Sequence, residues 1–281
     1  MKKTTTAKKT ADIEAITKEL EQGVLQVYDS KSYAEYLEFV SRFYNYSVNN
    51  TILIWMQMPT ASLVAGFKAW QEKFKRTVKK GEKGIRILAP CPKKFVKTVK
   101  DEDGNEVEKE IKYTTFRPCY VFDVSQTEGE DIPSFVNDLE GNVEQFQQIV
   151  DKLVKLAPVP VIFEKFDSPA KGYFDNMEKK IVVQPDMSET QTLKTLIHEI
   201  SHAILHDNEE GEQKDADRHT REVQAESVAY TVCSALGIDT SEYSFGYVAS
   251  WSNGKEVKEL TESMDVIRRT AKEMIEQLKA A

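Results

Sequence analysis

The stretch LIHEISHAILH, residues 196–206, constrains the chain most strongly, because it places three histidines and one glutamate in a largely apolar helical pattern. His198 and His202 are four residues apart, so on a helix both rings lie on one face and can reach one ion. Glu199 lies about 100° round the helix from His198, where it can reach a metal-bound water but not the metal itself. This HExxH spacing predicts a zinc site in which Glu199 takes a proton from the water and passes it to a leaving amine.

The third histidine of the stretch has a different role. His206 is eight residues beyond His198, which is about 12 Å along a helix axis. Ligands of one zinc ion lie only about 2 Å from it, so an unbroken helix cannot bring all three histidines to the same ion. The intervening residues contain no glycine that would turn the chain. We expect His206 to support a ligand or to be structural.

The third protein ligand has to come from another segment. The sequence REVQAESVAY, within a helix predicted over 220–236, supplies Glu222 and Glu226 one turn apart. We expect Glu222 to bind the ion and Glu226 to orient a ligand imidazole, with the reverse assignment left open. If the same side chains were only core or salt-bridged residues, they would have to be satisfied without an ion, which is costly. We therefore predict one Zn²⁺ per chain, although this ligand set also accepts other divalent metals.

Charge is distributed unevenly along the chain. Residues 1–125 hold 22 Lys and Arg against 16 Asp and Glu, whereas residues 126–281 hold 16 against 30. The excess is concentrated between Lys68 and Lys100, where twelve cations face only two carboxylates. This segregation predicts two modules with different partners, one of them a polyanion.

Residues 43–100 interleave aromatic side chains with these cations. Single-stranded nucleic acid is bound by such a mixture, because every base offers a face for stacking and every nucleotide a phosphate. In the alternative interpretation, the aromatics pack the core, the lysines form a solvated face and the asparagines cap a helix. The residues that we expect to contact nucleic acid are Tyr46, Asn49, Asn50, Lys68, Trp70, Lys79, Lys80, Lys83 and Arg86. The side chains that could extend this surface are Tyr113, Phe116, Arg117 and Tyr120.

The hydrophobic periodicity predicts a mixture of helices and strands, and we expect an α+β fold with an N-terminal α/β domain followed by a metal domain that the HExxH motif and the paired glutamates make gluzincin-like. We expect a disordered basic tail at 1–10, a first domain at 11–125, a linker at 126–140 and a second domain at 141–281. Helices are expected at 11–29, 32–45, 142–156, 220–236 and 256–280. Strands are expected on both sides of the polar tip DEDGNE, and a hairpin is expected with its turn at residues 176–178.

Composition indicates neither a membrane protein nor a secreted one. The longest near-continuous apolar run, TILIWMQM, is far shorter than the ~20 residues that span a bilayer. The basic start is not followed by the apolar segment of a secretory signal. Cys91, Cys119 and Cys233 form no CxxC pair, which fits free thiols in a reducing compartment. We expect a cytoplasmic protein without a membrane partner.

Together, HEISHAILH and REVQAESVA resemble the ImmA/IrrE-type metallopeptidases, whose HExxH motif is followed by a downstream ExxA helix. More closely, the chain resembles ArdC-like antirestriction proteins over about residues 10–275. The segments that carry this second resemblance are YNYSVNNTILIWMQ, VAGFKAWQ, VKKGEKGIRILAPCP, YVFDVSQT and YSFGYVASWS. The resemblance implies a single-stranded-DNA-binding domain before a zincin-type peptidase domain. It also implies that His198, His202 and Glu222 bind the metal and that Glu199 is the catalytic acid and base.

The expected function is that of an antirestriction or mobile-element protein that binds single-stranded DNA and hydrolyses an unidentified protein or peptide. Two alternatives stay open. The metal domain could be a protease that cuts a repressor or defence protein, with DNA binding serving only to localise it. The chain could also be a DNA-binding module whose zinc is structural and whose peptidase activity is vestigial. His219, Tyr243 and Tyr247 are further side chains that could reach the site.

Overall fold

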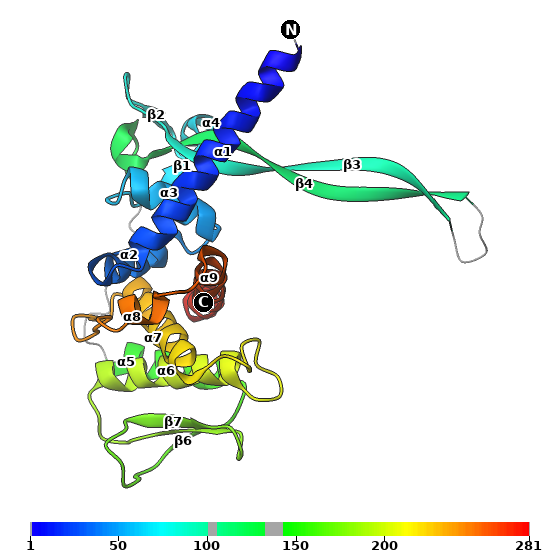
Figure 1. Ribbon diagram of the computed structural model, residues 1–281. Coiled ribbons are helices and arrows are strands. Elements are labelled where there is room, and N and C mark those ends of the chain that lie inside the picture. The colour runs from blue at the N-terminus through cyan, green and yellow to red at the C-terminus, as the bar shows by residue number, and fades with distance from the viewer. Residues whose placement is uncertain (1, 101–105, 133–142, 281) are drawn as a thin grey trace. The chain divides into compact units, whose positions relative to one another are not determined.

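The computed structural model describes residues 2–100, 106–132 and 143–280 (Figure 1). The chain forms two compact units, each built from helices and strands, which confirms the predicted α+β class. Unit 1 consists of Met1–Glu21 and Ile52–Glu130, and unit 2 of Gln22–Thr51 and Asp131–Ala281. By its contacts, the segment Gln22–Thr51 therefore belongs to the second unit, although it lies within the first domain expected from the sequence. We keep 11–125 and 141–281 as the proposed boundaries of the two domains along the sequence.

Unit 1 contains the first part of α1 (Lys2–Val27), most of α3 (Val48–Gln57) and α4 (Phe67–Glu72). β1 (Val64–Ala65), β4 (Glu106–Asp123) and β3 (Ile85–Lys100) form an antiparallel sheet in the order β1-β4-β3. Buried side chains that form the core of this unit include Ile16, Ile52, Ile54, Trp70, Ile85 and Val121.

The strands β3 and β4 form a long hairpin, paired from Ile85↔Val121 to Lys100↔Glu106. We call this pair of strands the hairpin arm. Strands on both sides of the polar tip are therefore confirmed, while most of the tip itself, 101–105, lies outside the described residues. Among the described residues, β1 pairs only with Phe122 and Asp123 at the end of β4, so most of the described part of the arm is a two-stranded ribbon. Figure 1 shows the arm extending away from the helices of unit 1.

Regular structure is also present in two segments that we expected to be a tail and a linker. The helix α1 spans Lys2–Val27, and no Gly or Pro interrupts the chain before Gly23; the basic tail at 1–10 stays a prediction. The start of the expected linker contains Gln126, the last residue of the short helix η1 (Val124–Gln126), and β5 (Thr127–Gly129), which pairs with β2 (Arg76–Val78). A capping box between the Asp123 and Gln126 side chains fixes that turn. Residues 133–140 of the expected linker lie outside the described residues.

Unit 2 is built on a three-stranded sheet with the order β6-β8-β7. The strands β6 (Val161–Phe163) and β8 (Lys180–Val183) are parallel, and β7 (Gly172–Asp175) is antiparallel to β8, which confirms the hairpin with its turn near 176–178. The helix α6 (Glu189–His206) packs against β7 and β8. The other helices are α2 (Ser30–Phe43), α5 (Val143–Leu156), α7 (Arg218–Ala235), α8 (Val248–Ser252) and α9 (Val257–Lys279).

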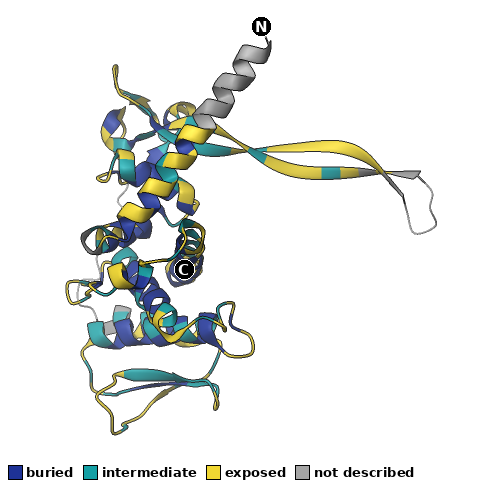
Figure 2. Cartoon of the chain, in the orientation of Figure 1, coloured by how far each residue is buried: buried dark blue, intermediate teal, exposed yellow. Residues whose placement is uncertain are grey.

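The helix α7 is central to unit 2, because α2, α6 and α9 all pack against it. Its small residues Ala225 and Ala229 are fully buried and allow this close approach. The Tyr33 hydroxyl on α2 lies 2.8 Å from the Ser227 hydroxyl on α7, which ties α2 to this core. Figure 2 shows the buried faces of these helices in dark blue. Among the described residues, no helix is both long and apolar enough to cross a membrane.

Candidate metal centre

The helix α6 presents one wall of the site. It begins after Ser188, whose hydroxyl accepts a hydrogen bond from the backbone N–H of Gln191. Its apolar face, with Leu196, Ile197 and Ile200, is fully buried and fixes the rotation of the helix in the core. Because that face is buried, the polar side chains of the HExxH motif lie along the helix at the edge of the core, beside α7.

The histidines of the motif converge with a glutamate from α7. Nε2 of His198 lies 3.1 Å from Nε2 of His202. Glu222 places its carboxylate oxygens 3.8 Å from Nε2 of His198 and 3.7 Å from Nε2 of His202. One ligand atom from each of the three residues lies within 4.8 Å of the others. The structure thus brings together the three residues that we predicted as metal ligands.

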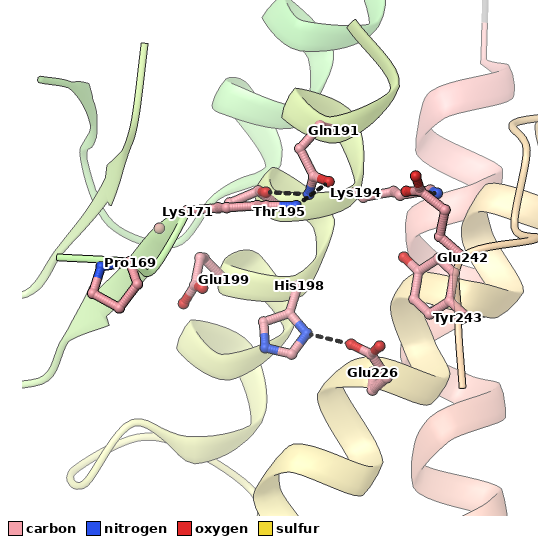
Figure 3. Close-up of a pocket in the computed structure, with 11 residues that line it drawn as sticks. Pro169, Lys171, Gln191, Lys194, Thr195, His198, Glu199, Glu226, Glu242 and Tyr243 are labelled. Atoms are coloured by element: carbon pink, nitrogen blue, oxygen red, sulfur yellow. Dashed lines mark hydrogen bonds and ion pairs between the residues drawn. The ribbon is translucent and has the colours of Figure 1, made fainter. Parts of the chain in front are cut away.

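Glu226 lies on the other side of His198. Its Oε2 is 3.1 Å from Nδ1 of His198, an interaction drawn in Figure 3. Burial disfavours a charge on His198, but the carboxylates of Glu226, Glu199 and Glu222 outweigh it and raise the pKa of the ring. With Glu226 at Nδ1, the Nε2 atom of His198 faces His202 and Glu222.

His202 and His206 continue this arrangement away from the ligand atoms. Their Nδ1 atoms are 3.0 Å apart, and Nε2 of His206 lies 3.0 Å from Oε1 of Gln224. If Nε2 of His202 is left as an acceptor, Nδ1–H of His202 donates to His206 and Nε2–H of His206 donates to Gln224. Burial, with the nearby His198, His206 and Arg221, lowers the pKa of His202 to about 2 and keeps it neutral. Burial also lowers the pKa of His206 to about 4.

Glu199 is buried, with 8% of its surface exposed. Burial raises the pKa of its carboxyl to about 6, and the charge of Glu222 adds to the shift, against His198 and a hydrogen bond from the backbone of Phe174. Figure 3 places Glu199 on the side of the His198 ring opposite Glu226, towards Pro169. A carboxyl with this pKa is suited to exchange protons near neutral pH.

Two hollows meet at these residues. One of about 590 Å³ also includes Lys171, Lys194 and Tyr243, and one of about 730 Å³ includes His202 and Glu222. Both are lined by Gly172, His198 and Glu199. A hollow therefore lies on each side of His198 and Glu199, and both hollows are bounded by β7 and α6.

Sequence reasoning missed two residues of this site. Gln224 completes the hydrogen-bond chain from His202 through His206. The sequence feature that could have indicated this role is a polar residue between Val223 and Ala225 on a buried helix. Gly172 lets β7 approach α6, because a Cβ there would lie 2.7 Å from Cγ2 of Thr195. No local sequence pattern indicates that contact. Of the three further candidates, Tyr243 lines the first hollow, whereas His219 packs against Tyr247 with ring centroids 5.8 Å apart.

The predicted nucleic-acid residues fall into both units. Tyr46, Asn49 and Asn50 belong to unit 2, and the six others belong to unit 1. The ring of Tyr46 packs edge-on against Phe43, with centroids 5.9 Å apart. The backbone N–H of Asn50 donates to the Ser47 hydroxyl at the start of α3, so Ser47 caps this helix.

The cations of unit 1 are mostly exposed. Lys68, Lys80 and Lys83 are on the surface, and so is Lys79, whose Nζ donates to the carbonyl of Ser125. These four remain candidates for phosphate contacts.

Trp70 and Arg86 differ from the prediction in their surroundings. Trp70 has no exposed surface and donates its indole N–H to the carbonyl of Phe122, 2.8 Å away. The expectation that Trp70 stacks on a base is therefore wrong, because the ring is part of the core. Arg86 forms a 2.5 Å ion pair with Glu19.

Comparisons with known proteins match both parts of the chain. The family model for the N-terminal domain of anti-restriction factor ArdC matches residues 7–122. The peptidase M78 model, described as the IrrE N-terminal-like domain, matches residues 155–244. An uncharacterized protein of Bacillus anthracis is 30% identical over 98% of this chain and 53% of its own length. The chain thus spans about half the length of that curated relative.

Two crystal structures of the antirestriction ArdC protein from the R388 plasmid have the same fold. The metal-free structure is 21% identical, with a TM-score of 0.53, and the Mn(II)-bound structure is 19% identical, with a TM-score of 0.51. Each comparison covers 83% of this chain and 85% of the other. With an ArdC N-terminal domain followed by an IrrE N-terminal-like domain, this chain is an ArdC-like protein.

Proposed function

We propose that the chain is an ArdC-like antirestriction protein in which unit 2 is a zinc-dependent peptidase and unit 1 binds single-stranded DNA. The observation that carries the peptidase proposal is the convergence of His198, His202 and Glu222, with ligand atoms within 4.8 Å of one another, beside the buried carboxyl of Glu199. The match to the peptidase M78 model supports the same assignment.

The donor set fits a zinc ion. Two neutral imidazoles and one carboxylate are ligands that catalytic zinc takes, with a fourth position left for water or substrate. Ligand atoms around a tetrahedral zinc lie about 3.3 Å apart, given bonds of about 2 Å. Nε2 of His198 and Nε2 of His202 are 3.1 Å apart, close to this value, and with one oxygen of Glu222 they form a set whose members all lie within 4.8 Å of one another. Glu222 can adjust, because its side chain is 51% exposed.

Each residue around the site has a separate role in the proposed hydrolysis. When bound, zinc would polarise the scissile carbonyl and acidify a water. Glu199 accepts the proton from that water and delivers it to the amide nitrogen that leaves. Glu226 holds the ring of His198, and His206 holds that of His202, so both present Nε2 as an acceptor.

The substrate is accommodated along β7. This strand is at the edge of its sheet and, among the described residues, pairs only with β8. An extended peptide added to such an edge forms backbone hydrogen bonds and passes through both hollows. Its scissile bond would then lie beside His198 and Glu199, which line both.

Metal analysis and a peptidase assay test the proposal. We expect about one zinc per chain, lost in the His198→Ala, His202→Ala pair and retained in the control His219→Ala, which changes an exposed histidine on α7. Glu199→Gln should keep the metal and lose hydrolysis. This variant also serves as a trap, because an uncleaved substrate protein would be recovered with it. Wild-type protein without metal would refute the site.

The same variant separates the proposal from its alternatives. If catalysis serves antirestriction, Glu199→Gln loses protection of incoming DNA. If the metal is structural, Glu199→Gln protects as well as the wild type. A protease directed at a repressor or defence protein would instead yield that protein in the trap. DNA affinity that falls steeply with salt supports phosphate contacts in unit 1, and a flat response removes them.

A further inference from the structure

The hairpin arm exposes an unusual set of aromatic side chains. The exposed fractions are 46% for Phe95, 43% for Tyr113, 55% for Phe116 and 60% for Tyr120. Only two other aromatic residues in the described part of the chain are exposed to this degree, Phe67 and Phe163. Figure 2 shows most of the arm in yellow. Four of the six exposed aromatic residues therefore lie on one ribbon.

These side chains do not pack a core. Beyond the two pairs with β1, the described strands of the arm pair only with each other. Phe95 and Tyr113 contact one another edge-on, with centroids 5.7 Å apart, and both remain exposed. Exposed apolar surface gathered on one element indicates a surface that binds something.

The same ribbon is rich in cations. β3 carries Arg86, Lys93, Lys94, Lys97 and Lys100 and no carboxylate. On β4, the run from Ile111 to Phe122 carries two cations and no carboxylate, whereas the start of the strand carries Glu106, Glu108 and Glu110, and Glu110 pairs with Lys94 at 3.0 Å. The register places Lys93 opposite Tyr113, so a cation and an aromatic ring are side by side on one face. The occupant that this surface suits is negatively charged and has flat apolar rings.

Protection of a sheet edge explains only part of this composition. Lysines and prolines on an edge strand prevent unwanted pairing with another chain, and Pro90 and Pro92 on β3 fit that purpose. Exposed aromatic rings have the opposite effect, because they favour association. A second copy of this chain added strand-to-strand is thus disfavoured along the very edge that carries the lysines.

We propose that both faces of the hairpin arm stack on bases of single-stranded nucleic acid, Phe95 and Tyr113 on one face and Phe116 and Tyr120 on the other, with Lys93 and Lys97 of β3 binding phosphates. Unpaired bases expose the faces that these rings require, whereas the bases of a duplex are stacked on each other. This inference rests on the proposed DNA binding by unit 1 and assigns it to the arm in place of Trp70, which is buried.

The test measures binding of the full chain to three 30-nucleotide probes: oligo-dT, oligo-U and an abasic DNA strand of equal length. One variant is Phe95→Ala, Tyr113→Ala and a second is Phe116→Ala, Tyr120→Ala. Val96→Ala on the arm, 57% exposed, and Phe163→Ala on β6, 43% exposed, are matched controls. We expect each double variant to bind oligo-dT about tenfold more weakly and the abasic strand unchanged, because only stacking is removed.

The binding results also distinguish a failure of DNA binding by the chain from a failure of base stacking by the arm. A wild type that does not bind oligo-dT refutes DNA binding itself. A wild type that binds, with double variants that bind equally well, refutes only the role of the arm. An equal loss for oligo-dT and the abasic strand also refutes stacking. Unchanged binding of the abasic strand by the double variants excludes a folding defect, and Tyr113→Phe, Tyr120→Phe should keep wild-type affinity because the rings remain. An equal loss on oligo-U supports base stacking on RNA as well, and oligo-U affinity that the double variants leave unchanged refutes stacking of RNA bases on the arm.

Discussion

Nδ1 of His198 lies 3.1 Å from Oε2 of Glu226, one helical turn beyond Glu222 on α7. A ring held in this way directs its other nitrogen, Nε2, towards the side where His202 and Glu222 lie. The two glutamates of α7 are therefore not equivalent. Glu222 faces both Nε2 atoms, whereas Glu226 contacts only the nitrogen that an ion does not need.

This difference predicts distinct losses of metal affinity. Glu222→Ala removes a ligand and should abolish stoichiometric zinc binding. Glu226→Gln removes only the charge that orients His198 and should weaken binding by about 10- to 100-fold. Competition with a chelator of known affinity measures both. The reverse order of losses would assign the ligand to Glu226 instead.

Gln224 is predicted to act through two imidazoles. Gln224→Leu leaves the buried Nε2–H of His206 without its acceptor. We expect a loss of about 1–3 kcal/mol in the free energy of unfolding and weaker zinc binding, because His202 loses the support of His206. Urea unfolding and metal titration measure the two effects. Gln147→Leu, at an exposed position on α5, is the control, and equal behaviour of both variants would contradict the role of Gln224.

The parts of this structure that the sequence predicts are those governed by local periodicity. The HExxH residues share a face of α6 because residues four apart always do, and paired glutamates on α7 follow the same rule. The two strands around the acidic tip are equally local. A residue whose role depends on distant neighbours is not predicted: Trp70 in an aromatic, basic segment indicates stacking, yet its ring packs in the core and bonds to Phe122.

The assignment of Gln22–Thr51 to unit 2 was not predicted either, because it also depends on distant neighbours. Its basis is contact between residues far apart in the chain, such as Tyr28, which donates to the carbonyl of Leu260, and Tyr33, which bonds to Ser227. Both tyrosines lie in helical patterns that would fit either unit. The role of Gly172 could not be predicted from the sequence either, because it depends on the close approach of β7 to α6.

The buried carboxyl of Glu199 predicts a pH-dependent penalty on stability in the metal-free protein. Its pKa is raised from 4.5 to about 6, so the fold favours the protonated form. The stabilisation is fully present below about pH 4 and is lost as the pH rises through 6. At pH 8, Glu199→Gln should therefore be more stable than the wild type by up to about 2 kcal/mol, since one pKa unit corresponds to about 1.4 kcal/mol.

Urea unfolding in the presence of a chelator, at pH 4 and pH 8, checks this sign. The advantage of Glu199→Gln should shrink towards zero at pH 4, where both side chains are neutral. A difference that is the same at both pH values would show that the substitution acts through packing and not through charge.

Gly172 is predicted to set the distance between β7 and α6. An added Cβ would lie 2.7 Å from Cγ2 of Thr195, 3.0 Å from the carbonyl oxygen of Val182 and 3.2 Å from Cγ of Glu199. Gly172→Ala should therefore destabilise unit 2 by about 1–3 kcal/mol, because the strand has to move off the helix. It should also reduce peptidase activity more than zinc binding, since Glu199 is displaced while the three ligands are not contacted.

Thermal unfolding, zinc titration and the peptidase assay on one preparation separate these effects. Gly246→Ala is the matched control, because its added Cβ would have only the Ser244 hydroxyl as a neighbour, at 4.0 Å. Wild-type activity in Gly172→Ala would mean that β7 yields without moving Glu199, and the close approach of strand and helix would then have no part in catalysis.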